Sequence, residues 1–460
     1  MSNFWDFSVW GGLNLMALLL LSLLLANWLK KSIKFLRMSL IPTSVLGGVI
    51  LLAIAGIYDI FSATPLFETA FFGGNGYDNL EIITYHTLAL GFIASSLKSS
   101  KGKLTKQRSI EIFNTGVTTV STYLIQGVLG MAITIVAAMV IKDFFPAAGI
   151  LLPFGYGQGT GQAMNYGTIY ETTNGFVGGK SFGLTIAALG FLSASIGGVI
   201  HLNILKKRGT IVLDGSEDGD NLKSDEIQSK NEIPMQGSMD KMTVQVGIVV
   251  LSYFITFLLM FLLGSLLPGM KAVIYGFNFL LGVLSATIVK AVIGLCRKTS
   301  IMKKDYVNDF LMTRISNFFF DIMVVAGIAA IRLGLLENYW GVISILGVVG
   351  LIISYVYNRI VVNTLFKDYK EEQFLMMYGM LTGTASTGTI LLREIDPDFK
   401  TPAADNMVYQ NFPAIVFGFP MMILATLAPK NPVLTLILLT AFFVVMNVIL
   451  FRSKIFKKRK

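Results

Sequence analysis

A glycine-rich motif occurs twice in this chain, as Tyr156-Gly-Gln-Gly-Thr-Gly-Gln-Ala163 and as Tyr378-Gly-Met-Leu-Thr-Gly-Thr-Ala385. Five of the eight positions are identical, and Gly-Thr-Ile follows soon after each copy. Each copy interrupts one hydrophobic half of the sequence. Paired interruptions at corresponding places of two halves are typical of transporters that are built from inverted repeats. The motif therefore predicts two related halves, each with a break in its helices.

The composition places the chain in a lipid bilayer. Apolar residues make up 54% of it and charged residues 14%, whereas soluble proteins average about a quarter charged. The apolar runs are about 20 residues long, which is enough to cross a hydrocarbon core of roughly 30 Å. The net charge of +10 lies mostly in short loops, where basic residues set orientation. We therefore expect a multi-pass membrane protein that does not bind nucleic acid.

Eleven apolar runs are expected to cross the membrane. Five lie in the first half, at about residues 8–28, 39–60, 82–98, 112–141 and 181–204. Five lie in the second half, at about 243–266, 272–295, 309–333, 340–365 and 408–428, and one follows at 432–451. Every second connection is basic: Lys30–Arg37, Lys98–Arg108, Lys206–Arg208, Arg297–Lys304 and Lys367–Lys370. Because basic loops stay in the cytoplasm, the N-terminus is predicted outside and the C-terminus inside.

The two motif segments, at about 148–178 and 374–400, are too polar and glycine-rich to cross. Since the flanking runs have opposite directions in the two halves, we expect re-entrant hairpins that enter from opposite sides and meet near the membrane centre. The predicted fold is all-α, with inverted five-helix repeats at 8–205 and 243–428 and a further helix at 432–451. The acidic segment 206–242 is predicted to be a cytoplasmic linker, because it has too little apolar surface to fold alone.

The chemistry expected at the hairpin tips comes from broken helix ends and hydroxyl groups. Helix N-termini attract carboxylates, and unwound carbonyl groups and hydroxyl oxygens suit a hard monovalent cation. Close packing by small residues is the alternative explanation, which we prefer for Gly190, Ala194 and Gly198. The predicted substrate-binding residues are Gln158, Gly159, Thr160, Gly161, Gln162, Thr382, Gly383, Thr384 and Asp321. The predicted ligands of a sodium ion are Thr160, Asn165, Thr384, Ser386, Thr387 and Asn411.

Ionisable side chains inside spans are often functional, and Asp321 and His86 are two that lie inside predicted spans. Asp321 could hold a cation or a substrate ammonium group, or it could pair with Arg314 or Arg332. For His86 we expect a hydrogen-bonded structural role rather than a ligand role.

The chain resembles the bacterial sodium:glutamate symporters. The resemblance rests on Ile41-Pro-Thr-Ser-Val-Leu-Gly-Gly48, Leu90-Gly-Phe-Ile-Ala-Ser-Ser-Leu-Lys98, Gly159-Thr-Gly161 and Leu189-Gly-Phe-Leu-Ser-Ala-Ser-Ile-Gly-Gly198. It implies a homodimer in the bacterial cytoplasmic membrane. In each protomer a mobile unit that carries both hairpins would move L-glutamate with sodium by an elevator-type mechanism. Related folds carry citrate and other hydroxycarboxylates, so a sodium-coupled di- or tricarboxylate carrier is the alternative.

Other classes of function fit the sequence less well. A membrane-embedded enzyme needs converging acid, base or metal groups, but the spans hold one clear aspartate and the whole chain has two histidines. A channel would favour rings of charge around a pore rather than two opposed hairpins. The single cysteine, Cys296, cannot form an internal disulfide. We expect a transporter rather than an enzyme, with sodium as the coupling ion and no other cofactor.

Overall fold

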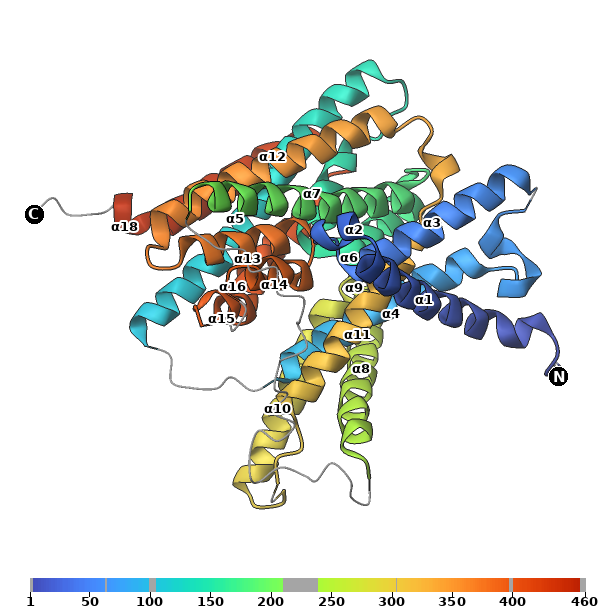
Figure 1. Ribbon diagram of the computed structural model, residues 1–460, viewed down its shortest axis with the longest axis horizontal. Coiled ribbons are helices and arrows are strands. Elements are labelled where there is room, and N and C mark those ends of the chain that lie inside the picture. The colour runs from blue at the N-terminus through green and yellow to red at the C-terminus, as the bar shows by residue number, and fades with distance from the viewer. Residues whose placement is uncertain are drawn as a thin grey trace, which may run out of the picture. The chain divides into compact units, whose positions relative to one another are not determined.

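The computed structural model describes residues 3–62, 64–98, 105–209, 239–302, 304–396 and 400–455, and these residues form helices and no β-strand (Figure 1). The long helices are α1 (Phe7–Ser32), α3 (Thr43–Phe61), α4 (Gly76–Leu97), α5 (Lys106–Val140), α7 (Gly179–Lys207), α8 (Lys241–Leu266), α10 (Asn278–Lys298), α11 (Asp309–Ala329), α12 (Trp340–Leu365) and α17 (Pro432–Leu450). The others are α2 (Lys34–Met38), α6 (Leu151–Asn174), α9 (Lys271–Gly276), α13 (Lys370–Thr382), α14 (Ala385–Arg393), α15 (Ala403–Tyr409), α16 (Asn411–Leu427) and α18 (Arg452–Ile455). Short 3₁₀ turns are η1 (Leu66–Glu68), η2 (Ala70–Phe72), η3 (Pro146–Ile150), η5 (Pro268–Met270) and η6 (Leu333–Leu336).

Among the described residues, ten helices are long and apolar enough to cross a membrane. They are the ten long helices named above, with η2 continuing into α4. An eleventh crossing arises if α15 and α16, which are bent by 53° at a short break, form one span. Pro413 lies at this break, and proline disfavours helical backbone in the residue before it. The prediction of a multi-pass membrane protein is confirmed.

Several helices begin or end away from the predicted bounds. Helix α4 begins at Gly76 rather than at residue 82, and α5 begins at Lys106 rather than at 112. Both extensions contain charged residues. The predicted starts were later because they were placed where the sequence becomes apolar, whereas a helix can begin earlier in the polar interface, where charged residues are tolerated. The N-terminus of α5 is capped by the Thr105 hydroxyl, which accepts a hydrogen bond from the Arg108 backbone at 3.3 Å.

The predicted run 272–295 is divided between two helices in the structure. The short helix α9 covers its beginning, and the long helix α10 starts only at Asn278. The predicted run 309–333 is also shortened, since α11 ends at Ala329. Of the predicted acidic linker 206–242, residues 210–238 lie outside the described part of the chain.

The chain divides into two compact units. The first contains Met1–Glu81, Leu104–Leu213 and Val324–Lys460, and the second contains Ile82–Lys103 and Asp214–Met323. The core of the first unit includes a cluster around α13, with Phe374, Met376 and Tyr378 fully or almost fully buried. The core of the second unit brings Ile93 of α4 together with residues of α8, α10 and α11. Both copies of the repeated motif lie in the first unit.

Both motif segments fold back on themselves. In α6 the rings of Phe154 and Tyr166 stack with centroids 4.0 Å apart, although twelve residues of continuous helix would separate them by about 18 Å. Between α13 and α14, a methyl group built on Gly379 would lie 2.7 Å from the Cα of Gly388. Each segment therefore consists of two helical arms that lie side by side.

Candidate functional site

The first arm of α6 ends at Gly159. This residue has φ 79° and ψ −172°, a conformation that is nearly restricted to glycine because a β-carbon would clash with the backbone. The helix before Gly159 therefore ends with carbonyl groups at the break, and the arm that starts at Thr160 presents its N–H groups there. Thr160 is fully buried against α11, where a methyl group on Gly327 would lie 2.6 Å from the Thr160 Cβ.

The second break lies at Gly383 and Thr384, which both have non-helical backbone: Gly383 has φ −144° and ψ −109°, and Thr384 is extended. Thr384 caps α14, since its hydroxyl oxygen accepts a hydrogen bond from the Thr387 backbone at 3.4 Å and lies 3.3 Å from the Thr387 hydroxyl. Thr382 is fully buried, and its hydroxyl donates to the Tyr378 carbonyl at 2.6 Å. This break has the same layout as the first, with helix carbonyls on one side and helix N–H groups on the other.

The two folded-back segments meet on α7. Gly190 of α7 touches both: a methyl group there would lie 2.5 Å from the Thr382 carbonyl oxygen and 3.2 Å from the Tyr156 Cα. Residues of α6 also pack directly against α13. Gly190 and Gly198 are closely packed, as expected, since a methyl group on Gly198 would lie 2.4 Å from Leu391 of α14, and Ala194 is fully buried.

The tyrosines that begin the two motif copies converge on one serine of α7. The Tyr156 hydroxyl donates to the Gly347 carbonyl at 2.6 Å and lies 2.8 Å from the Ser193 hydroxyl. A tyrosine hydroxyl has one proton, so the Ser193 hydroxyl must be the donor in the second contact. The Tyr378 hydroxyl donates to the Ser193 carbonyl at 2.8 Å. Matched positions of the repeat are thus held by a single residue.

Gln126 of α5 connects the second break to α12. Its side-chain amide nitrogen donates to the Leu381 carbonyl at 3.1 Å and to the Ser354 hydroxyl at 2.8 Å, while its side-chain carbonyl oxygen is buried without a partner in the described residues. Gln126 was not among the residues predicted from the sequence. A buried glutamine in a long apolar run was the available signal.

The other predicted polar residues of the first segment are also buried. The Asn165 amide donates to the Gln162 side-chain oxygen at 2.9 Å, which leaves the Gln162 amide nitrogen buried and without a partner among the described residues. Gln158 is half-buried beside Gly159, and Gly161 is buried. No group of three acidic, histidine or cysteine residues is arranged for metal binding in the described part of the chain. The chemistry near the breaks is therefore that of amides, hydroxyls and helix ends.

The remaining predicted residues lie in different surroundings. Ser386 is half-buried in the first turn of α14. Asn411 is exposed, and its side-chain oxygen accepts from Gln410, whose amide also reaches the Met380 sulfur of α13 at 3.6 Å. Asp321 is half-buried on the portion of α11 that belongs to the second unit.

Three charged or ring residues proposed for structural roles have clear partners. Arg332 pairs with Asp78 and Glu81, at 3.5 Å from each. Arg314 stacks on the Phe310 ring, with its guanidinium carbon 5.0 Å from the ring centroid. The His86 Nδ1 lies 2.6 Å from the Tyr253 hydroxyl, which confirms that this histidine is hydrogen-bonded within the second unit.

A charged anchor holds the beginning of α13. Glu371 forms two hydrogen bonds with the Arg359 guanidinium, at 2.7 and 2.9 Å, and one with the His201 Nε2 at 2.8 Å. His201 is buried, and its Nδ1 lies 2.8 Å from the Tyr355 hydroxyl. Burial alone would raise the pKa of Glu371, but the hydrogen bonds from His201 and Arg359 and the arginine charge lower that pKa to about 2. The carboxylate thus fixes α13 to both α7 and α12.

Comparison with known proteins does not identify the chain. No protein-family model matches it, and no curated protein is significantly similar in sequence. The two breaks are therefore the features of the molecule that indicate a function.

Proposed function

We propose that this protein is a secondary active transporter that carries L-glutamate across the bacterial cytoplasmic membrane together with sodium. The observation that carries the proposal is the pair of motif segments, each with a break in its helix, that pack together on α7. A broken helix offers N–H groups to a carboxylate and carbonyl groups to a cation, and two such breaks at one place can bind both ions together.

The chemistry of the buried side chains supports this assignment. Thr160, Thr382 and Thr387 are fully buried near the breaks, and hydroxyl and carbonyl oxygens suit a small hard cation. The side-chain amide nitrogen of Gln162 is buried without an acceptor among the described residues, which costs about 1–3 kcal/mol. A carboxylate oxygen of a bound substrate would supply that acceptor. In this proposal Gln162 binds the substrate, and sodium lies among the threonine oxygens.

The proposed membrane arrangement consists of two inverted repeats with re-entrant hairpins. The first half supplies α1, α3, α4, α5, the folded-back α6 and α7, and the second half supplies α8, α10, α11, α12, the α13–α14 pair and α15–α16. The equal order of elements and the repeated motif support the repeat. The alternation of basic loops supports an outside N-terminus and a cytoplasmic C-terminus.

The proposed mechanism is alternating access of the elevator type in a homodimer. Both breaks belong to one of the two compact units, so one body could carry the complete site. A site that moves as a whole needs no open pore, which distinguishes this mechanism from a channel. The resemblance to the sodium:glutamate symporters supports the same mechanism.

Uptake into proteoliposomes tests the function. Labelled glutamate, aspartate and citrate are supplied with an inward sodium gradient or with potassium at equal concentration. We expect glutamate uptake that requires the sodium gradient. If sodium drives uptake of citrate alone, glutamate is not the substrate and the protein is a sodium-coupled carrier of tricarboxylates. If the sodium gradient drives uptake of none of the three, the proposal is wrong.

Thr384→Val and Thr389→Val form a matched pair for this assay. Thr384 lies at the break, whereas the Thr389 hydroxyl only donates to the Ala385 carbonyl within α14. We expect Thr384→Val to raise the sodium concentration needed for half-maximal uptake and Thr389→Val to leave it unchanged. Equal behaviour of the two variants would exclude Thr384 from the sodium site.

A further inference from the structure

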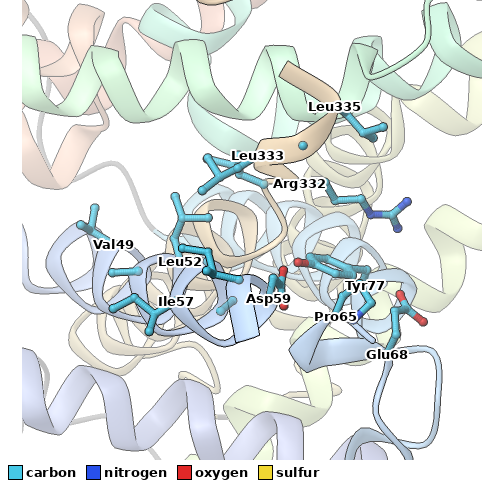
Figure 2. Close-up of a pocket in the computed structure, with 16 residues that line it drawn as sticks. Val49, Leu52, Ile57, Asp59, Pro65, Glu68, Tyr77, Arg332, Leu333 and Leu335 are labelled. Carbon is cyan, nitrogen blue, oxygen red and sulfur yellow. The ribbon is translucent and has the colours of Figure 1, made fainter. Parts of the chain in front are cut away.

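A cavity separate from the breaks lies in the first unit, beside α3 and η6. Its volume is about 930 Å³, within the range of roughly 300–1,000 Å³ that is usual for ligand pockets. Most of its wall is apolar and comes from α3 and from the chain after α11, including Val49, Leu52, Ile57 and Leu333 (Figure 2). This is not a site for a small polar solute.

The polar groups of the cavity have both signs of charge and lie together. Asp59, Glu68, Tyr77 and Arg332 are grouped in Figure 2, whereas Val49 and Leu52 lie farther along α3. The Arg332 guanidinium carbon lies 4.8 Å from the centroid of the Tyr77 ring. One oxygen of Asp59 accepts a hydrogen bond from the Leu66 backbone at 2.8 Å. The cavity thus presents two carboxylates and a guanidinium next to a long apolar wall.

Arg332 retains an unused hydrogen-bond donor. Its Nη2 forms ion pairs with Asp78 and Glu81, but its Nε is buried and has no hydrogen-bond partner among the described residues. A buried donor without an acceptor is unfavourable, and an arginine fork is well suited to two oxygens of a phosphate. A third of the Arg332 side chain is exposed, so an oxyanion at this end of the cavity could pair with the accessible part of the guanidinium.

The apolar wall lies where lipid chains are available. Helix α3 is one of the candidate spans, and Ile57 and Ile60, which line the cavity, are 60% and 77% exposed. The helix rises about 16 Å between Val49 and Ile60, so the wall runs from the span end toward the membrane interior. Asp59 lies near the end of α3, Glu68 lies in η1 between α3 and α4, and Arg332 follows the end of α11, so all three are at span ends, the level at which headgroups are found.

We propose that this cavity binds one phospholipid with a primary-amine headgroup, of the phosphatidylethanolamine type. The lipid phosphate pairs with Arg332, the ammonium group pairs with Asp59 and Glu68, and one acyl chain lies along α3. A lipid without the amine would leave the two carboxylates facing a phosphate, and a purely cationic ligand would face Arg332. Only a zwitterion complements both signs of charge, and among zwitterionic headgroups a primary ammonium, unlike choline, has N–H groups to donate to the two carboxylates.

The test uses the full-length protein in mild detergent with equimolar phosphatidylethanolamine, phosphatidylcholine and phosphatidylglycerol, followed by native mass spectrometry. We expect one phosphatidylethanolamine per chain, retained about tenfold more than phosphatidylglycerol, since a charge-assisted hydrogen bond has about that effect on affinity. Equal retention of the three lipids, or preference for phosphatidylcholine or phosphatidylglycerol, would overturn the proposal.

Adjacent substitutions on α3 separate the cavity from the general lipid surface. Ala53 lines the cavity, whereas the next residue, Ile54, is exposed but does not. Ala53→Phe should lower retention about tenfold by filling the cavity, and Ile54→Phe should leave it unchanged. If both variants retain the lipid as the wild type does, the cavity is not its site. If a cysteine at position 53 forms a crosslink between two copies of the chain, and the crosslinked protein retains no lipid, the cavity is occupied by a second copy. That result would also overturn the proposal.

The headgroup contacts are tested by removing one charge. Asp59→Asn keeps an oxygen for the Leu66 backbone but loses one of the two negative charges, so it should reduce the preference for phosphatidylethanolamine over phosphatidylcholine. Asp78→Asn serves as the control, because Asp78 pairs with Arg332 without lining the cavity. An unchanged preference in Asp59→Asn would refute the ammonium contact. This proposal is independent of the transport assay.

Discussion

Gly159 occupies a backbone conformation that residues with a β-carbon avoid, and the break in α6 depends on it. An alanine at this position would either hold a strained conformation at a cost of about 1–3 kcal/mol or restore a continuous helix. Both outcomes displace the carbonyl and N–H groups that we assign to ligand binding. The same substitution at an ordinary left-handed glycine should have less effect on function.

Gly159→Ala should therefore reduce glutamate uptake at least about tenfold, since loss of one ligand contact of about 1.4 kcal/mol has that effect on an equilibrium. The control is Gly175→Ala, because Gly175 also has positive φ, 73°, but lies at the far end of α6 with open space around it. Uptake rates are compared at equal amounts of folded protein. Equal loss in both variants would indicate general strain rather than a ligand site.

The two motif tyrosines should differ in their effect on stability. Tyr156→Phe removes the acceptor of the Ser193 hydroxyl, which leaves a buried donor unpaired at a cost of about 1–3 kcal/mol. Tyr378→Phe removes a bond to the Ser193 carbonyl, which lies within α7 and keeps its helical partner, so about 0.5–1.5 kcal/mol is expected. Thermal unfolding of the purified variants should show the larger loss for Tyr156→Phe, and the reverse order would contradict the assigned contacts.

Helices are held to one another by contacts that a local sequence pattern cannot reveal. The folded-back segments could be predicted, because glycine and threonine act on their own backbone and the motif is repeated. The bond from Gln126 to Ser354 joins residues 228 positions apart, and that from His201 to Glu371 joins residues 170 apart. Such pairs depend on which helices pack together, so the residues around the breaks were only partly predicted. Ser193 was given no individual role, although it lies in the Leu189–Gly198 motif that carries the family resemblance.

The anchor of α13 gives a pH dependence with a definite sign. The folded-state pKa of Glu371 is lowered from 4.5 to about 2, so its carboxylate stabilises the fold above pH 4.5. That stabilisation is lost as the pH falls from 4.5 toward 2. The difference in unfolding temperature between wild type and Glu371→Gln should therefore be largest near neutral pH and shrink below pH 4.5. Glu337→Gln, at an exposed position, is the control, and a difference that does not change with pH would contradict the anchor.

At the scale of the whole molecule, the order of helices and the basic loops determine the proposed orientation. Multi-pass membrane character was predictable from composition, because each span must be apolar over about 20 residues. Exact helix ends were less predictable, since α4 and α5 extend into charged sequence. The division of the chain into two units depends on long-range packing, so it could not be predicted from the positions of the apolar runs in the sequence.

Side-specific labelling tests the orientation. After replacement of Cys296, single cysteines are placed at Glu337, between α11 and α12, and at Lys454, after α17, which are both exposed. In intact cells an impermeant thiol reagent should label position 337 and reach position 454 only after permeabilisation. Labelling of both positions from outside would contradict an odd number of crossings between them.

The central claim is that sodium and the carboxylate substrate bind together at the two breaks. Calorimetry of glutamate binding to the purified protein, with and without sodium, measures this coupling directly. By thermodynamic linkage, sodium should raise glutamate affinity by the same factor by which glutamate raises sodium affinity, and a coupling of about 1–3 kcal/mol corresponds to roughly 5- to 150-fold. We expect an increase in this range in wild type and a smaller one in Thr384→Val. Glutamate affinity that does not depend on sodium would contradict the account.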